Sequence, residues 1–132
     1  MEQLTTQKII GAAIEVHRRL GPGLLESTYE ACLAQEFKFL NIQFERQRSY
    51  PLIYREAFVE SAYRVDFLVE GEIVVEIKAV EALTNIHVAQ LLTYLRLLNL
   101  PKGLLLNFNV SALKDGIKRV SNAKNTYNNP SV

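Results

Sequence analysis

Three charged side chains lie inside runs of apolar residues in the middle of the chain, where burial normally excludes charge. Asp66 lies within Val65–Val69, and Glu76 and Lys78 lie within Ile73–Ala79. A carboxylate seldom lies in a buried strand unless it is paired or binds a cation. Because Mg²⁺ is typically bound by one or two carboxylates together with phosphate oxygens, these residue types indicate a candidate site for metal-dependent phosphate chemistry.

The spacing of the three residues predicts how their side chains are arranged. Glu76 and Lys78 are two apart, so on a strand they leave the same face. If Glu70–Glu72 forms a three-residue loop with Gly71 in the left-handed conformation, the register places Asp66 directly opposite Glu76. Like charges in opposite positions repel, and a divalent cation would turn that repulsion into coordination. The alternative is a structural cluster in which Lys78 neutralises one carboxylate; a two-residue turn would favour it, because Asp66 would then point to the other face.

The elements before these strands are predicted to be two helices. Apolar residues recur at helical spacing over Thr6–Leu20 and again over Leu25–Leu40. The segment Gly21–Gly23 ends the first helix. The two helices are therefore expected to form a hairpin.

The rest of the chain predicts a mixed sheet. A helix between Ile73–Lys78 and Gly103–Phe108 has the length of a β-α-β crossover, so these two strands should be parallel. A last short helix is expected over Ser111–Val120. The order is ααββββαβ(α), with residues 1–120 as one α/β domain and 121–132 as a disordered polar tail. The remaining expected elements are strands at 42–54, 57–63 and 65–69 and a helix at 86–100.

Length and composition exclude several classes of protein. The chain has 132 residues, 48% hydrophobic and 22% charged, as is usual for one globular domain. Its single cysteine, Cys32, excludes an internal disulfide and a Cys-cluster zinc site. No run approaches the roughly 18 apolar residues that span a bilayer, and the N-terminus lacks the layout of a signal peptide. We therefore expect a cytoplasmic protein with no membrane partner.

Charge is distributed unevenly along the chain. Residues 1–95 carry 9 Lys/Arg and 13 Asp/Glu, whereas residues 96–132 carry 6 Lys/Arg and one Asp, for a total of +1. A globally basic nucleic-acid-binding protein is thereby excluded. A basic end beside acidic residues suits a polyanion that is held by metal ions. A solvated helix face with a loose tail would give the same pattern.

Several motifs in order resemble the PD-(D/E)XK nuclease superfamily. Asp66, followed ten residues later by Glu76-Ile77-Lys78, is similar to its Asp…Glu-x-Lys core. Gly23–Tyr29 matches the G-x-x-E-x-x-Y signature of the GxxExxY protein group within it. Where the superfamily has a proline before its aspartate, this chain has Val65. The resemblance covers about residues 5–120 and continues through Tyr63–Asp66, Glu76–Val80, His87–Leu95 and Gly103–Phe108.

The resemblance implies a restriction-endonuclease-like core, with a central four-stranded mixed sheet flanked by helices. It also implies hydrolysis of phosphodiester bonds in DNA or RNA that depends on Mg²⁺, with Mn²⁺ as a substitute. Lys78 would be catalytic together with the acidic residues. The implied metal ligands are Asp66, Glu76, Glu26 and the carbonyl of Ile77, and the implied substrate-positioning residues are Gln90, Tyr94, His87 and Tyr29.

The helical spacing of the remaining implied residues is compatible with these roles, but it is equally compatible with purely structural roles. Glu26 and Tyr29 share a helix face, and Glu26 could equally complement the helix dipole. His87, Gln90 and Tyr94 form a polar ridge, which could equally consist of packed polar groups and a surface histidine. The alternative function is a catalytically silent nuclease-fold protein that acts as a nucleic-acid-binding or protein-interaction module. Because phosphate contacts dominate nucleic-acid affinity, a lone domain at +1 should bind duplex weakly unless it forms a homodimer.

Overall fold

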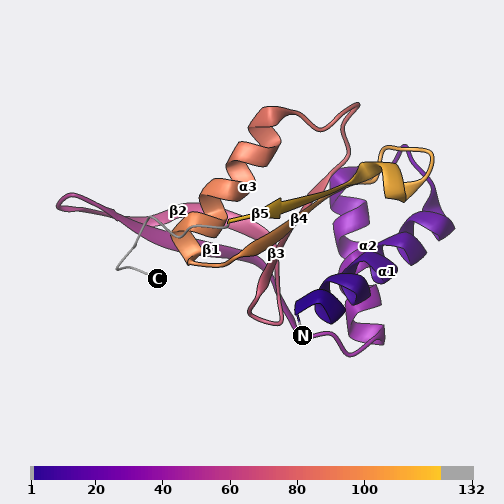
Figure 1. Cartoon of the computed structure of the whole chain (residues 1–132), viewed down its shortest axis with the longest axis horizontal. Helices are drawn as coiled ribbons and strands as arrows, with labels where there is room; N and C mark the ends of the chain where they lie inside the picture. Colours follow the sequence, from indigo (N-terminus) through magenta and orange to yellow (C-terminus); the bar gives the residue numbers. More distant parts are fainter. Residues whose placement is uncertain (1, 123–132) are drawn as a thin grey trace.

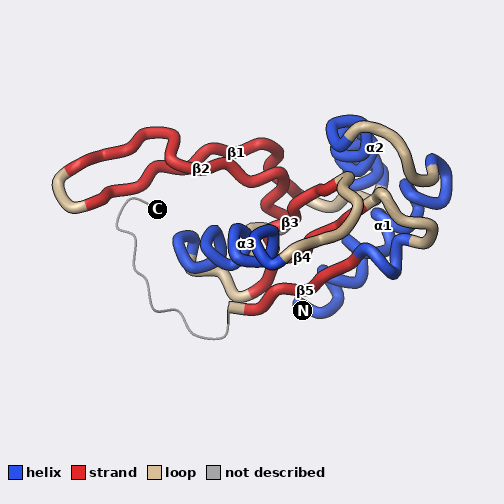
Figure 2. Tube along the Cα trace, turned by 90° about the horizontal axis from the view of Figure 1, so that it is seen from above, coloured by secondary structure: helices blue, strands red, loops and turns tan. Residues whose placement is uncertain are grey.

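A five-stranded sheet with the order β1-β2-β3-β4-β5 forms the centre of the computed structural model, which describes residues 2–122 (Figures 1 and 2). Neighbouring strands are antiparallel except β3 and β4, which are parallel as predicted. The predicted α/β class is confirmed, with one strand more than the four that the family resemblance implies. The strands are β1 (Phe44–Tyr54), β2 (Ala57–Val69), β3 (Ile73–Lys78), β4 (Lys102–Asn107) and β5 (Ile117–Ser121).

Helices cover both faces of the sheet and create two apolar cores. The hairpin of α1 (Glu2–Leu20) and α2 (Glu26–Phe39) packs on one face, and α3 (Asn85–Leu98) packs on the other (Figure 1). The first core includes Phe37, Phe67 and Phe108, and the second includes Leu91 and Leu95. Strand β3 contributes alternate residues to the two cores, so the end of this strand lies between the helix layers.

The loop between β2 and β3 sets the register that the sequence predicts. Val69 pairs with Ile73, which leaves three loop residues. Two of them, Glu70 and Gly71, have φ angles of 55° and 66°, so the loop turns through the left-handed region. The pairing continues as far as Phe67 and Val75.

Two predicted elements are wrong. The strands expected at 57–63 and 65–69 form one continuous strand, because no glycine or proline interrupts β2. The helix expected over 111–120 is a short 3₁₀ turn, Leu113–Gly116, followed by β5. Gly116 explains this change, because a Cβ there would lie 2.1 Å from the carbonyl oxygen of Asn107. This close approach directs the following residues alongside β4 as an antiparallel strand.

Strands β1 and β2 continue beyond the rest of the sheet as a two-stranded ribbon (Figures 1 and 2). Strand β3 pairs with β2 only between Phe67 and Val69, whereas β1 pairs with β2 as far as the turn. The tip of this ribbon exposes large apolar side chains, namely Tyr54, Phe58 and Val59.

The described chain ends just after β5. Ser121 closes that strand, and the backbone N–H of Asn122 donates to the carbonyl oxygen of Pro101 at 2.8 Å. The rest of the predicted tail, 123–132, lies outside the described residues. No helix within residues 2–122 has the length and apolar character needed to cross a membrane.

Candidate active site

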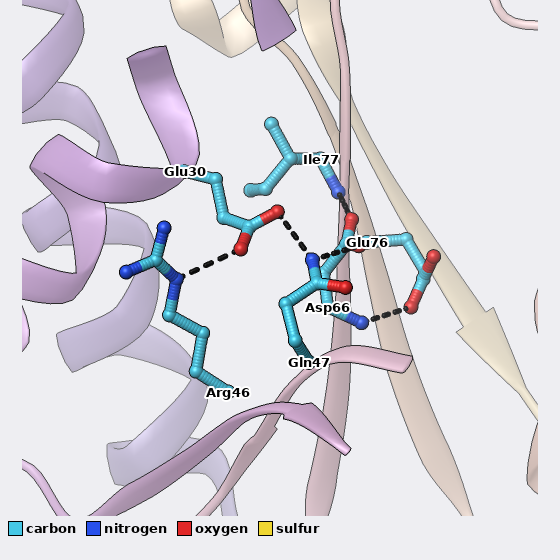
Figure 3. A network of polar contacts seen from close by, with 6 residues as sticks. All are labelled: Glu30, Arg46, Gln47, Asp66, Glu76 and Ile77. Carbon is cyan, nitrogen blue, oxygen red and sulfur yellow. Dashed lines mark hydrogen bonds and ion pairs between the residues drawn. The ribbon is translucent and has the colours of Figure 1, made fainter. Parts of the chain in front are cut away.

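Asp66 and Glu76 lie where β2 and β3 part. One position beyond the last regular pair, the backbone N–H of Asp66 donates to Oε2 of Glu76 at 2.9 Å. In the other direction, the backbone N–H of Ile77 donates to Oδ2 of Asp66 at 2.8 Å (Figure 3). Each carboxylate thus binds a main-chain amide of the neighbouring strand. The two acids lie side by side between the strands, as the predicted register requires.

Burial makes the ionised forms of both acids unfavourable. Glu76 is 4% exposed, and this burial, together with the negative charge of Asp66, raises its pKa to about 8. Burial also raises the pKa of Asp66, and the charges of Glu30 and Glu26 add to the effect. The positive charge of Lys78 and the amide hydrogen bonds act in the opposite direction. A cation between the two acids would relieve this electrostatic cost.

Lys78 is half-buried at the last position of β3, and the strand alternation places it on the face of Glu76. Among residues 2–122, no ion pair within 4.0 Å includes Lys78, Asp66 or Glu76. The direct pairing that a purely structural cluster would need is therefore not formed. Lys78 acts on the two acids through its field and keeps its ammonium group available for another partner.

The donor set suits a hard divalent cation. In the described part of the chain, Oε2 of Glu76 accepts a backbone N–H, whereas no hydrogen bond is found to its Oε1, which can therefore bind a cation. Mg²⁺ usually takes only one or two carboxylates and completes its shell with water and phosphate oxygens. Residues 2–122 contain no group of three or more His, Cys, Asp or Glu side chains placed to bind a metal. Glu26, the third predicted ligand, is exposed at the start of α2 and reaches the pair through its charge.

A second carboxylate on α2, which the sequence analysis missed, is connected to Asp66 by hydrogen bonds. Glu30 is buried and pairs with Nε of Arg46 at 2.8 Å. Nε2 of Gln47 donates to Oε1 of Glu30 at 2.6 Å and to Oδ1 of Asp66 at 3.1 Å (Figure 3). The sequence feature that could have identified Glu30 is its spacing, because it lies one helical turn after Glu26 and so shares its helix face.

Comparison with known families agrees with this geometry. A sequence model described as the PD-(D/E)XK nuclease superfamily matches residues 3–120. The chain belongs to the PD-(D/E)XK nuclease superfamily. The match includes both helix layers and all but the last residue of the sheet. It therefore contains the position where β2 and β3 part, with Asp66 and Glu76. Comparison with curated proteins and with solved structures gives no significant match.

Helix α3 of this superfamily member brings one predicted positioning residue to the edge of the acidic pair. Tyr94 is half-buried, and its ring stacks on that of Tyr63 with centroids 5.2 Å apart. Burial raises the pKa of Tyr94, and the charges of Glu76 and Asp66 raise it further, so the phenol lies within their field. Gln90 is exposed one turn earlier on the same helix.

The other two predicted positioning residues have local partners. The backbone N–H of Thr84 donates to Nδ1 of His87 at 3.0 Å, so this imidazole caps the start of α3. Tyr29 is fully buried. Its hydroxyl donates to the carbonyl oxygen of Gly21 at 2.6 Å and accepts from the N–H of Leu24 at 3.1 Å. Tyr29 thus fixes the loop that leads into α2 and, through it, the start of the helix that carries Glu26 and Glu30.

Proposed function

We propose that this protein is a metal-dependent nuclease that hydrolyses phosphodiester bonds of DNA or RNA. One observation carries the proposal: the half-buried carboxylate of Asp66 and the buried carboxylate of Glu76 lie side by side where β2 and β3 part. Lys78, on the same strand face as Glu76, forms no ion pair within residues 2–122. Membership in a nuclease superfamily supports the interpretation of this arrangement as a metal site for phosphodiester hydrolysis. Within residues 2–122 neither acid forms a direct ion pair, so both carboxylates are free to bind a divalent cation, which would favour their ionised forms.

In this proposal Asp66 and Glu76 bind Mg²⁺, or Mn²⁺ in its place, and the Ile77 carbonyl and Glu26 add ligands. When bound, such an ion polarises the scissile phosphate and lowers the pKa of a water molecule. Lys78 is the catalytic residue that orients the attacking water and stabilises negative charge on the phosphate.

The substrate enters along α3 in this proposal. Tyr94 lies within the field of the two acids and Gln90 is exposed one turn away, so both side chains can contact a phosphate or sugar beside the site. His87 supports this face by capping the helix start. Tyr29 acts from within the protein, because its buried hydroxyl positions the loop before α2.

We further propose that the chain belongs to the GxxExxY group within the superfamily. Each of the three residues that define the motif, Gly23, Glu26 and Tyr29, has its own structural role, which supports this assignment. Gly23 has a φ of 103°, an angle that residues with a side chain rarely adopt. Glu26 is the first residue of α2. Tyr29 supplies the hydroxyl that binds both sides of the intervening turn.

The second candidate function is a nuclease-fold protein without catalysis that binds nucleic acid or another protein. Its support is the absence of a three-acid metal group among residues 2–122 and the net charge of +1. Such a protein would keep its fold and would bind nucleic acid or another protein, but it would not cleave nucleic acid.

We also propose a homodimer. A single domain of charge +1 has little electrostatic attraction for a phosphate backbone, and two copies would double the contact. The ribbon tip of β1 and β2 offers an apolar surface for this contact. Residues 51–62 at this tip carry one arginine and two glutamates, so the segment is slightly acidic. Such a segment is better suited to contact another protein than a negatively charged nucleic acid.

The decisive experiment is a cleavage assay on single- and double-stranded DNA and RNA with Mg²⁺ or Mn²⁺, and with EDTA. Wild-type protein should cut at least one substrate with metal, and Lys78→Ala should abolish cutting while it leaves the fold intact. Lys114→Ala is the control, because Lys114 is an exposed lysine in the 3₁₀ turn, outside the strands that carry the two acids. If wild-type protein cuts no substrate with either ion, the nuclease proposal fails and the binding module is favoured.

A further inference from the structure

The side-chain amide of Gln47 lies between two carboxylates. Its Nε2 donates to Oε1 of Glu30 at 2.6 Å and to Oδ1 of Asp66 at 3.1 Å (Figure 3). An ionised carboxylate only accepts hydrogen bonds, so the amide nitrogen must face both acids. One NH₂ group therefore uses both of its protons to connect helix α2 to strand β2.

The backbone of Gln47 is specialised for this position. Its φ is 54°, in the left-handed region that a non-glycine residue adopts only at an energetic cost. The residues on both sides keep regular pairing, Arg46 with Phe67 and Arg48 with Val65. Within β1 the unusual conformation is thus confined to Gln47, whose side chain donates to Asp66.

Charge is divided unequally in this network. The guanidinium of Arg46 pairs with Glu30, whose charge it balances. Within the part of the chain that the structure describes, the Asp66 carboxylate in contrast accepts hydrogen bonds from neutral donors alone, the amide of Gln47 and the backbone N–H of Ile77. A neutral donor orients a carboxylate without cancelling its charge, whereas a cation at the same place would compete with a bound metal ion.

We propose that Gln47 and Glu30 form a positioning relay for Asp66: Gln47 orients the Asp66 carboxylate toward a divalent cation, and Glu30, balanced by Arg46, orients Gln47. This inference rests on the proposed function, because it assigns a metal ion to Asp66. Hydrogen-bond partners of metal-binding side chains commonly decide affinity, and their loss costs roughly ten- to a hundredfold. Gln47 and Glu30 are positioning residues, since neither needs to contact substrate.

The test is the affinity of the full chain for Mn²⁺ alone, measured by electron paramagnetic resonance on wild-type protein and on Gln47→Ala, Gln47→Lys and Gln43→Ala. Gln47→Ala should weaken Mn²⁺ binding roughly ten- to a hundredfold. Gln47→Lys should weaken it further, although an ammonium supplies donors to both acids and should preserve thermal stability. Gln43→Ala, which changes an exposed glutamine just before β1, should leave affinity unchanged.

The Lys variant separates positioning from a merely structural role. If Gln47 only joined α2 to β2, Gln47→Lys would restore whatever Gln47→Ala loses, and this result would overturn the relay. Unchanged Mn²⁺ affinity in Gln47→Ala would also overturn it while the proposed nuclease activity stands. Wild-type protein that binds Mn²⁺ but cuts nothing contradicts the nuclease proposal, and the relay is then decided by the affinities. Wild-type protein that binds no Mn²⁺ overturns the relay outright.

Discussion

The backbone N–H of Asp66 donates to the side chain of Glu76, 2.9 Å away on the neighbouring strand. This bond replaces a main-chain contact with a side-chain contact at the position where regular pairing between β2 and β3 ends. The carboxylate of Asp66 does the same for the N–H of Ile77. The acids therefore have a structural task in the sheet as well as the proposed chemical one, and variants must separate the two.

Asp66→Asn should separate stability from metal binding. An asparagine keeps an oxygen acceptor for the N–H of Ile77 and removes the charge beside Glu76, so the fold should persist. Asp66→Ala leaves that N–H without its acceptor, which typically costs about 1–3 kcal/mol when the group is buried. We expect Asp66→Ala to have a lower free energy of unfolding in urea than Asp66→Asn, while both lose Mg²⁺-dependent cleavage. Equal stabilities would show that the bond to Ile77 contributes nothing.

The stability of the metal-free protein should fall as pH rises. The pKa of Glu76 is about 8 in the folded protein against an ordinary value of 4.5, so folding favours its protonated form. Its contribution is complete below pH 4.5 and is lost as pH rises through 8, a loss on the order of a few kcal/mol. Urea unfolding in EDTA at pH 5 and pH 9 should show this loss in wild-type protein and a smaller one in Glu76→Gln. Parallel pH profiles for the two proteins would contradict it.

Divalent cations should stabilise the folded chain. A ligand at 100 times its dissociation constant stabilises a protein by about 2.7 kcal/mol when it binds only the folded state. Thermal unfolding with increasing Mn²⁺ should therefore show a rising midpoint in wild-type protein and no change in Glu76→Ala. Glu72→Ala is the matched control, because Glu72 lies in the loop before β3, outside the acidic pair. An equal rise in all three proteins would indicate non-specific binding.

Local sequence rules predicted the core of this site, and long-range contacts account for what they missed. The three-residue loop around Gly71 fixed the register of Asp66 and Glu76, because loop length and strand alternation are local properties. Strand β5 was not predictable, because it depends on the approach of Gly116 to a carbonyl group of β4. The link through Gln47 joins residues 17 and 19 positions apart, and its left-handed backbone has no sequence signal.

Tyr29→Phe should test whether this residue positions a loop or contacts substrate. The hydroxyl connects the carbonyl oxygen of Gly21 with the N–H of Leu24, and the ring stacks on Phe108 with centroids 4.7 Å apart. Phenylalanine keeps the stacking and loses both hydrogen bonds, so the free energy of unfolding should fall by about 1–3 kcal/mol. Urea denaturation measures this loss. A variant with wild-type stability but a raised KM for nucleic acid would instead indicate substrate contact.

The ribbon tip should control self-association. Phe58 is 63% exposed and pairs across the ribbon with Ile53, in a two-stranded segment that a third strand does not support. Isolated hairpins are marginally stable in water, and exposed apolar patches usually mark a contact surface. Sedimentation equilibrium should therefore give a dimer for wild-type protein and a monomer for Phe58→Lys. Phe39→Lys is the matched control, since Phe39 is a still more exposed phenylalanine, at 76%, and ends α2, a helix that lies far from the ribbon tip in Figure 1. A wild-type monomer at every concentration, or a dimer lost only with Phe39→Lys, would contradict the ribbon as the dimer surface.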